Sequence, residues 1–342
     1  MNVSGKRVLV TGGTGFLGSS LVRSLLRAGA IVRSLDDDSR GSAGRLRDLA
    51  GKVELIRGDI RSPEEVAAAI AGVDCVCHLA YLNGTEFFYS RPDLVLEIAV
   101  KGMMNVLDGC IKHGVRDLVL ASSSEVYQTP PTVPTDESVP LIIPDPFNPR
   151  YSYGGGKVIS ELLAINYGRK HFDRVVIFRP HNVYGPDMGR EHVVPQLTLR
   201  LIELAKGTSG PIDLPIQGTG EETRAFVYVD DLSAAVMRTI EAGEHLSIYH
   251  VGTDREVTIA TLATEIGRCL GREINVIPGT LQPGSTLRRC PDIGKIRALG
   301  YEPRVSLSEG LARTVRWYVE NEKENGKTSD KLGEKKKVNG LP

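Results

Sequence analysis

Short hydrophobic runs alternate with amphipathic stretches through the first half of the chain. The runs cover residues 7–10, 30–35, 53–56, 75–79, 117–120 and 174–178. Between them, apolar residues recur at helical spacing, as over residues 17–28, 63–70 and 94–112. Strands that alternate with helices in this way predict a doubly wound α/β fold, in which helices cover both faces of a parallel sheet. The ligand site of such a fold lies at the carboxyl ends of the strands.

The alternation loosens after about residue 180. Segments 207–215 and 278–284 are rich in Gly and Pro, and helical patterns cover residues 194–205, 231–242 and 259–270. We therefore expect a first domain over residues 1–180 and a smaller C-terminal α/β domain over 181–325, interleaved with the first. Residues 326–342 are rich in Lys, Gly and other polar residues with nothing to build a core, and predict a disordered tail.

The composition is that of an ordinary globular protein. Lys plus Arg and Asp plus Glu both number 42, so the formal net charge is zero. Without a basic block outside the tail, neither nucleic acid nor a membrane surface is an expected partner. No apolar run approaches the roughly 20 residues that cross a bilayer, and the N-terminus has no signal-peptide layout. We expect a cytoplasmic protein.

The cysteines are few and scattered: Cys75, Cys77, Cys110, Cys269 and Cys290. An odd number at these spacings fits neither a disulfide framework nor a zinc knuckle. We interpret them as buried free thiols, and no metal site is predicted.

A glycine-rich loop, T-G-G-T-G-F-L-G, follows the first strand and precedes a helix. Gly12 permits a tight turn, Gly15 lets the backbone approach a pyrophosphate, and Gly18 lets the helix pack on the strand. A pyrophosphate would then sit at the positive end of the helix. Strand, loop and helix in this order predict a Rossmann-type dinucleotide site.

Two carboxylates bear on which dinucleotide is bound and how its adenosine is held. Asp36 ends the second strand, where a carboxylate accepts hydrogen bonds from the adenosine ribose and repels a 2′-phosphate. This favours NAD over NADP, although Arg40 nearby softens the rule. Asp59, after the third strand, either meets the adenine amine or caps the helix that starts near Pro63.

Tyr153 and Lys157 are spaced i and i+4 and share one face of a helix. An ammonium beside a tyrosine stabilises the phenolate, which lowers the tyrosine pKa from about 10. The phenolate can remove a proton from a sugar hydroxyl while hydride leaves the same carbon. A serine hydroxyl from Ser122–Ser124, at the end of the fifth strand, can bridge substrate and Tyr153.

Several motifs in order resemble one family, the extended short-chain dehydrogenase/reductases that modify nucleotide sugars, or NAD-dependent epimerase/dehydratase family. The resemblance covers about residues 5 to 320. Its motifs are the glycine loop, H-L-A (78–80), S-S-S-E-V-Y (122–127), Y-G-G-G-K (153–157), R-P-H-N-V-Y-G-P (179–186), R-A-F-V-Y-V-D-D (224–231) and R-C-P-D-I (289–293).

The resemblance implies roles for individual residues. The catalytic group comprises Ser123, Ser124, Glu125, Tyr153 and Lys157. Cofactor contacts come from Gly12, Gly15, Phe16, Leu17, Gly18, Asp36, Arg40, Asp59, Ile60, Leu79, Ala80, Tyr81, Ser122, Tyr153, Lys157 and Pro180. The nucleotide diphosphate sugar is bound by Asn182, His192, Arg224 and Arg289, and guanidinium groups suit phosphate oxygens. The alternative for each arginine is a surface ion pair.

Three positions depart from the family pattern. Tyr81 replaces the second alanine of H-L-A-A and is expected to crowd or stack near the nicotinamide. Gly156 replaces the serine before the lysine, and Ala99 replaces an asparagine. These departures concern substrate detail rather than cofactor chemistry.

The family's branches differ in the step after oxidation at carbon 4. Dehydration needs an acid and a base, and here Ser124-Glu125 replaces the Asp–Glu pair of dTDP-glucose dehydratases, although GDP-mannose dehydratases have Ser-Glu. A UDP-glucuronate-type decarboxylase needs a cation for the sugar carboxylate, for which Arg190 and His192 are candidates. His181 is similar to a residue of GDP-mannose 3,5-epimerases, but for His181 and His192 alike we expect a structural hydrogen-bonding role rather than a catalytic one.

Epimerisation demands the fewest groups, so we predict an epimerase, in which Glu125 has no obvious part. The rivals are a dehydratase, a decarboxylase, a dehydrogenase that releases NADH, and a non-catalytic NAD-binding sensor or scaffold. Residues 94–112 and 160–169 are expected to pair across a two-fold axis in a homodimer, as in the family.

Overall fold

The computed structural model describes residues 1–281 and 286–338, with side chains up to residue 322. The chain forms two compact units. The first comprises Met1–Val183, Thr223–Glu256 and Thr286–Val305, and the second comprises Tyr184–Glu222, Val257–Ser285 and Ser306–Pro342. The predicted ranges, 1–180 and 181–325, were expected to interleave, and two segments after residue 180 belong to the first unit.

The first unit contains a seven-stranded sheet in the order β11-β6-β5-β4-β1-β2-β3, and every pair is parallel. Six strands coincide with the predicted runs: β1 (Arg7–Thr11), β2 (Ile31–Asp36), β3 (Val53–Arg57), β4 (Cys75–His78), β5 (Asp117–Ala121) and β6 (Arg174–Pro180). The seventh, β11 (Ser247–Val251), was not predicted and pairs with β6. The doubly wound α/β prediction is confirmed.

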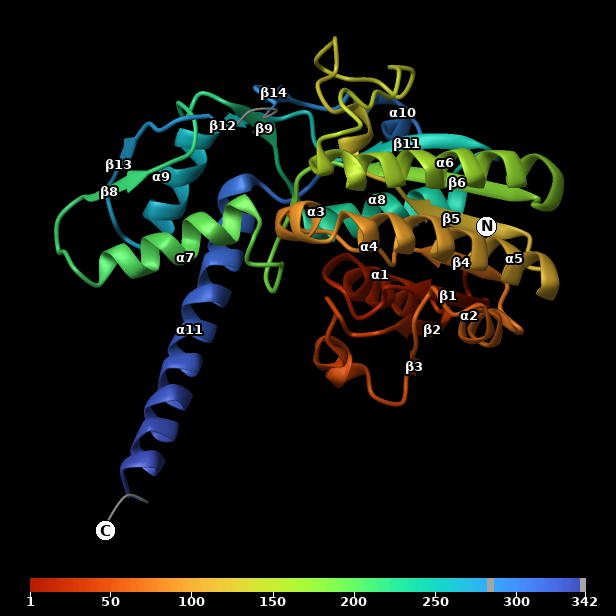
Figure 1. Cartoon of the computed structure of the whole chain (residues 1–342), viewed down its shortest axis with the longest axis horizontal. Helices are drawn as coiled ribbons and strands as arrows, with labels where there is room; N and C mark the ends of the chain where they lie inside the picture. The colour runs from red at the N-terminus through yellow and green to blue at the C-terminus, as the bar shows by residue number, and fades with distance from the viewer. Residues whose placement is uncertain (282–285, 339–342) are drawn as a thin grey trace. The chain divides into compact units, whose positions relative to one another are not determined.

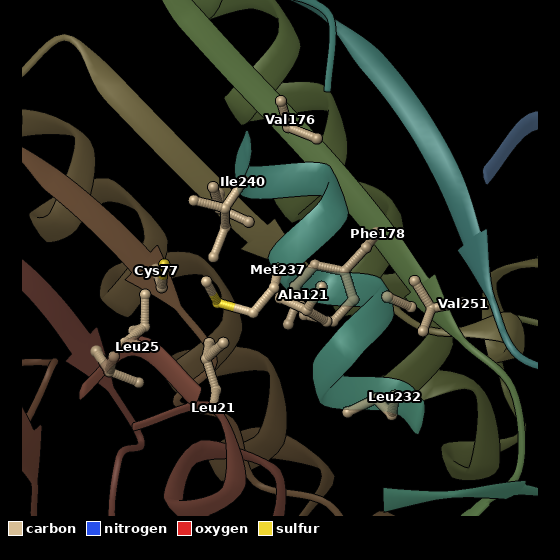
Figure 2. Packing of buried hydrophobic residues seen from close by; sticks show 14 of the residues in the cluster. Leu21, Leu25, Cys77, Ala121, Val176, Phe178, Leu232, Met237, Ile240 and Val251 are labelled. Atoms are coloured by element: carbon tan, nitrogen blue, oxygen red, sulfur yellow. The ribbon is translucent and has the colours of Figure 1, made fainter. Parts of the chain in front are cut away.

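Helices cover both faces of this sheet (Figure 1). Helices α1 (Phe16–Arg27) and α8 (Val229–Ala242) bury their apolar sides on one face, together with α10 (Gly294–Arg297). Helices α2 (Pro63–Ile70), α5 (Met103–His113) and α6 (Ser152–His171) bury theirs on the other. Figure 2 shows Met237 and Ile240 of α8 among Phe178, Val251 and Leu21, in the first of these two cores.

The segment between β4 and β5 is more broken than the predicted helix over 94–112. It contains α3 (Thr85–Ser90), α4 (Pro92–Glu97), a π-helical turn at Ile98–Gly102, and α5. The wider π-turn is an irregularity that the periodicity of apolar residues does not reveal. The remaining short strands are β7 (Val183–Tyr184), β9 (Thr223–Ala225), β10 (Val227–Tyr228), β12 (Glu256–Thr258) and β14 (Arg288–Arg289).

The second unit pairs β8 (Ile212–Pro215) in parallel with β13 (Ile274–Ile277). Helices α7 (Val193–Ala205), α9 (Ile259–Cys269) and α11 (Leu307–Val338) pack on one another in the same unit. The backbone of α11 stays helical to Val338, which differs from the tail predicted from residue 326. Its many Lys and Glu residues are good helix formers, so low hydrophobicity alone does not exclude a helix there. Within the described residues, no helix combines the length and apolarity that a membrane span requires.

Candidate active site

The glycine loop has no space for a side chain at two of its positions. A Cβ at Gly12, whose φ is +73°, would lie 2.7 Å from the Ala80 nitrogen, and one at Gly18 would lie 2.0 Å from the Gly12 carbonyl oxygen. Gly15 is the N-cap of α1 and has no side chain that could accept hydrogen bonds from the first N–H groups of the helix. Phe16 and Leu17 begin the first turn. A loop without side chains at a helix N-terminus is the arrangement that binds a pyrophosphate in Rossmann-type folds.

The carboxylates beyond the loop are held by their own surroundings. Asp36 accepts hydrogen bonds from the backbone N–H groups of Thr14 and Asp38, both at 3.0 Å. The guanidinium of Arg40 lies 5.3 Å from the Phe87 ring, and burial lowers its pKa. Arg40 therefore packs on α3 as well as lying near Asp36 in sequence.

Asp59 does not cap α2, as one alternative held, because Ser62 does so by accepting from the Glu65 N–H. The Asp59 carboxylate pairs instead with Arg61 at 2.6 Å, and hydrogen bonding to Arg61 lowers its pKa. If Asp59 contacts the adenine amine as predicted, its carboxylate would bond both the amine and Arg61. The next residue, Ile60, is buried.

The strand ends place the other predicted cofactor residues. Leu79 and Ala80 follow β4, and their N–H groups donate to the carbonyl and hydroxyl of Thr11 at 3.1 and 3.2 Å. Pro180 ends β6 and lies beside Val251 of β11. All these residues lie at the carboxyl edge of the sheet, where a doubly wound fold binds its ligand.

Tyr153 and Lys157 occupy the first turns of α6, and both are buried. Burial raises the pKa of Tyr153 to about 12, against a hydrogen bond with Ser123 that lowers it, so the expected lowering of this pKa is not found. Burial lowers the pKa of Lys157 to about 7, against the nearby Glu161 carboxylate, which raises it. The Lys157 Nζ donates to the Ala121 carbonyl oxygen at 2.7 Å and lies 6.0 Å from the centre of the Tyr153 ring. The Phe88 ring of α3 stacks on Tyr153 at 5.0 Å.

Ser122 begins a buried polar network that the sequence did not reveal. Its hydroxyl donates to Glu161, whose carboxylate pairs with Arg179 at 2.6 Å, and both charged side chains are only 2% exposed. Arg179 also donates to the Tyr127 hydroxyl, which bonds His250 Nε2 at 2.6 Å. The Ser122 hydroxyl thus supports the fold behind the site. One signal was available: Glu161 lies four residues after Lys157, on the same helical face.

Glu125 lies in a short 3-10 turn, Ser124–Tyr127, that Ser123 caps by accepting from the Glu125 N–H at 3.2 Å. Its carboxylate accepts a hydrogen bond from Arg289 Nη1. Burial alone would raise the Glu125 pKa, but Arg289, then Arg150 and Arg224, outweigh burial and lower it. Arg150 was not predicted as a site residue.

The two arginines predicted to bind the diphosphate, Arg224 and Arg289, both donate hydrogen bonds to Thr286. Arg289 donates through Nη2 to the Thr286 hydroxyl at 3.2 Å, and among the described residues its buried Nε has no partner. Arg224 donates to the carbonyl oxygens of Thr286 and Thr223 at 2.6 and 2.7 Å. The ion pair of Arg289 with Glu125 is partly buried, with the two side chains 10% and 29% exposed, which differs from the alternative of a surface ion pair.

The structure disagrees with the expectation for His181. Its ring is 1% exposed, and neither ring nitrogen has a hydrogen-bond partner in the part of the chain that the structure describes. It lies edge-on to His250 at 4.7 Å, and burial lowers its pKa well below the ordinary value. The expected hydrogen-bonding role is therefore not what these contacts show.

Of the remaining predicted residues, only Asn182 lies in the first unit. It has a φ of +37°, and its amide donates to the Ala225 carbonyl oxygen at 3.4 Å. His192 and Arg190 belong to the second unit, where His192 precedes α7 and Arg190 pairs with Glu322 at 2.6 Å.

Comparison with known proteins decides the family. The model of the NAD dependent epimerase/dehydratase family matches residues 8–252. The chain belongs to this family. It is accordingly an enzyme with NAD as its cofactor, and the interpretation as a non-catalytic scaffold is set aside.

Its relatives within the family perform different reactions. The chain is 30% identical to a dTDP-glucose 4,6-dehydratase from Streptomyces niveus, with 92% of this chain and 93% of the relative covered. It is 33% identical to UDP-glucuronic acid decarboxylase 6 from Arabidopsis thaliana, with 90% and 87% covered. A solved UDP-glucose 4-epimerase from Thermus thermophilus, in complex with NAD, is 30% identical with a TM-score of 0.79, and 91% and 98% are covered.

Proposed function

We propose that this member of the family is a nucleotide-sugar epimerase that oxidises the sugar transiently at carbon 4. Bound NAD would supply the hydride acceptor for this oxidation and the hydride donor for the reduction that follows. The similarity to a UDP-glucose 4-epimerase supports this reaction class. The nucleotide and the sugar are to be found by experiment.

In this proposal the residues at the end of β5 and the start of α6 handle the proton. The Ser123 hydroxyl, which lowers the Tyr153 pKa by hydrogen bonding, orients the sugar hydroxyl. Tyr153 takes the proton as a phenolate and gives it back after the ketone has turned over. Lys157 stabilises the phenolate with its positive charge. The diphosphate is bound by Arg224, Arg289 and Asn182. The buried Arg289 Nε has no hydrogen-bond partner among the described residues, so it can donate to a phosphate oxygen.

The state of Glu125 is the observation that carries the choice of epimerisation. Dehydration requires an acid for the carbon 6 hydroxyl and a base at carbon 5. Ser124 offers no acid, and the paired Arg289 lowers the pKa of Glu125, which makes it a weaker base. In an epimerase, Glu125 would orient Arg289, an arginine proposed to bind phosphate, through their ion pair. This gives Glu125 a role that 4-epimerisation itself does not require.

Decarboxylation is the second candidate, favoured by the surplus of positive charge. Arg289, Arg150 and Arg224 all act on the single carboxylate of Glu125. Two of these charges suit a diphosphate, and a third suits the carboxylate of a sugar acid. Oxidation of such a sugar at carbon 4 gives a β-keto acid, which loses carbon dioxide without a protein acid.

One experiment separates these reactions. The purified enzyme is incubated with UDP-, GDP-, CDP- and dTDP-sugars, including UDP-glucuronate, and the products are analysed by chromatography and mass spectrometry. An unchanged mass with a new retention time supports the epimerase. Loss of water or of carbon dioxide would replace it by a dehydratase or a decarboxylase. NAD that stays bound through purification separates an epimerase from a dehydrogenase that releases NADH.

The proposed base is tested by Tyr153→Phe. We expect turnover to fall by a factor on the order of 10² to 10⁴, because the proton has no acceptor. NAD affinity, measured by titration calorimetry, should stay within about twofold. Activity equal to that of the natural enzyme would remove Tyr153 from the mechanism.

A further inference from the structure

The three departures from the family pattern meet at one point beside the catalytic pair. A Cβ built on Gly156 would lie 2.2 Å from the Tyr81 hydroxyl oxygen and 2.8 Å from the Ala99 Cβ. Tyr81 follows β4, Gly156 lies in α6, and Ala99 lies in the π-helical turn Ile98–Gly102. Real Cβ atoms essentially never show contacts under 3.0 Å, so a side chain at position 156 would require the end of the Tyr81 side chain to move.

Tyr81 contacts both proposed catalytic residues. The Lys157 Nζ lies 3.8 Å from the centre of the Tyr81 ring, well within cation–π range. The ring meets that of Tyr153 edge-on, at 5.1 Å and 82°. The Tyr81 hydroxyl donates to the Tyr153 carbonyl oxygen at 3.3 Å, and burial holds the Tyr81 pKa well above its ordinary value, so the hydroxyl remains a donor.

We propose that Tyr81 is a positioning residue that holds the Lys157 ammonium on its ring face, and that Gly156 and Ala99 are small because they accommodate it. This rests on the proposed roles of Tyr153 and Lys157. Tyr81 acts on the reaction through the charge and placement of Lys157.

The first part of the test replaces Tyr81 by two other apolar residues. Tyr81→Leu keeps an apolar side chain beside Lys157 but removes the ring, whereas Tyr81→Phe keeps the ring. Loss of the cation–π contact makes the ammonium less stable and the Tyr153 phenolate with it. We expect the acid limb of the kcat profile to move to higher pH by about half a unit or more in Tyr81→Leu. It should stay within about 0.2 units in Tyr81→Phe; an unmoved limb in Tyr81→Leu overturns the proposal.

The second arm tests the steric dependence, and the neighbouring glycine provides its control. A Cβ at Gly155 would meet only the Ile143 Cδ1, at an ordinary 3.6 Å. We expect Gly156→Ala to lower kcat by about tenfold or more, Gly155→Ala to leave it unchanged, and Tyr81→Phe to recover part of the loss in the double variant. Equal activity of the two glycine variants overturns the proposal.

A folding measurement keeps this test independent of the substrate. Urea unfolding is measured for four proteins: the natural enzyme, Tyr81→Phe, Gly156→Ala and the double variant. Their free energies of unfolding give the coupling energy between positions 81 and 156. If no nucleotide sugar is turned over, the proposed function fails, yet a coupling between Tyr81 and Gly156 still supports their steric dependence. Additive effects in this cycle overturn it.

Discussion

Two buried histidines, in edge-to-face contact, differ in what their ring nitrogens meet. His250 bonds the Tyr127 hydroxyl and the Asp292 carbonyl oxygen, whereas both nitrogens of His181 lack partners among the described residues. A buried polar group without a partner is costly, and its removal is not. We expect His250→Phe to lower the free energy of unfolding by about 1–3 kcal/mol and His181→Phe to leave it unchanged or raise it. Urea denaturation measures both; a fall of similar size in His181→Phe would mean that its nitrogens are bonded.

The sequence revealed residues whose partners are close along the chain. Tyr153 and Lys157 were found because they are one helical turn apart, and the glycine loop because its spacing is local. Tyr127 and His250 bond each other across 123 residues, and no local pattern records such a pair. The expectation for His181 was wrong for the same reason, since only the packing shows which groups reach its ring.

At the scale of elements, the sheet depends on a strand from late in the chain. Strand β11 covers the edge of β6, and α8 buries Met237 and Ile240 against the sheet. A chain truncated after Val183 lacks both, so it exposes a strand edge and an apolar face. We expect this fragment to aggregate, as measured by solubility and circular dichroism. A soluble, cooperatively unfolding fragment would contradict the dependence.

A second truncation provides the control and tests the predicted tail. Removal of residues 326–342 takes away polar sequence with few apolar residues to bury, so the free energy of unfolding should change by less than about 0.5 kcal/mol. A larger loss by urea denaturation would show that this segment contributes to the fold.

Six strands and the main helices followed from apolar periodicity, but β11 did not. Its sequence, S-I-Y-H-V, mixes polar with apolar residues, and His250 within it belongs to the polar network rather than to an apolar run. The sequence therefore assigned α8 to the second domain, although the helix packs on α1 in the first unit. Local patterns give the type of an element more reliably than its place in a sheet.

At the scale of the whole molecule, apolar side chains remain exposed on the helices predicted to form a dimer. Leu96 of α4, Ile111 of α5, and Ile159 and Leu162 of α6 are exposed. We expect Leu162→Glu to shift the protein to monomer in gel filtration with light scattering, because a carboxylate would be buried in the interface. Leu55→Glu on β3 is the matched control, since Leu55 is 47% and Leu162 54% exposed. A natural protein that is already monomeric would contradict the predicted homodimer.

Buried neutral histidines make the fold sensitive to acid. Burial lowers the pKa of His78 to about 3 and that of His250 to about 4, from 6.5. Below pH 6.5 the unfolded chain binds protons that the native state does not, so the stabilisation is complete above this pH and is lost as the pH falls toward 4. We expect the free energy of unfolding to fall between about pH 6.5 and 5 by about 1.4 kcal/mol per pH unit for each histidine. Urea denaturation at both pH values checks this, and His250→Phe should remove one histidine's share of the slope.

The first unit is built from three segments, the last of which ends at Val305. A ribosome must therefore release most of the polypeptide before the nascent sheet can acquire its edge strand and close its cores. Until then the emerging β6 presents an unpaired edge, which is a site for association with other nascent chains. The order of its segments thus delays completion of the sheet until late in synthesis, and we expect the yield in cells to rise when chaperones are co-expressed.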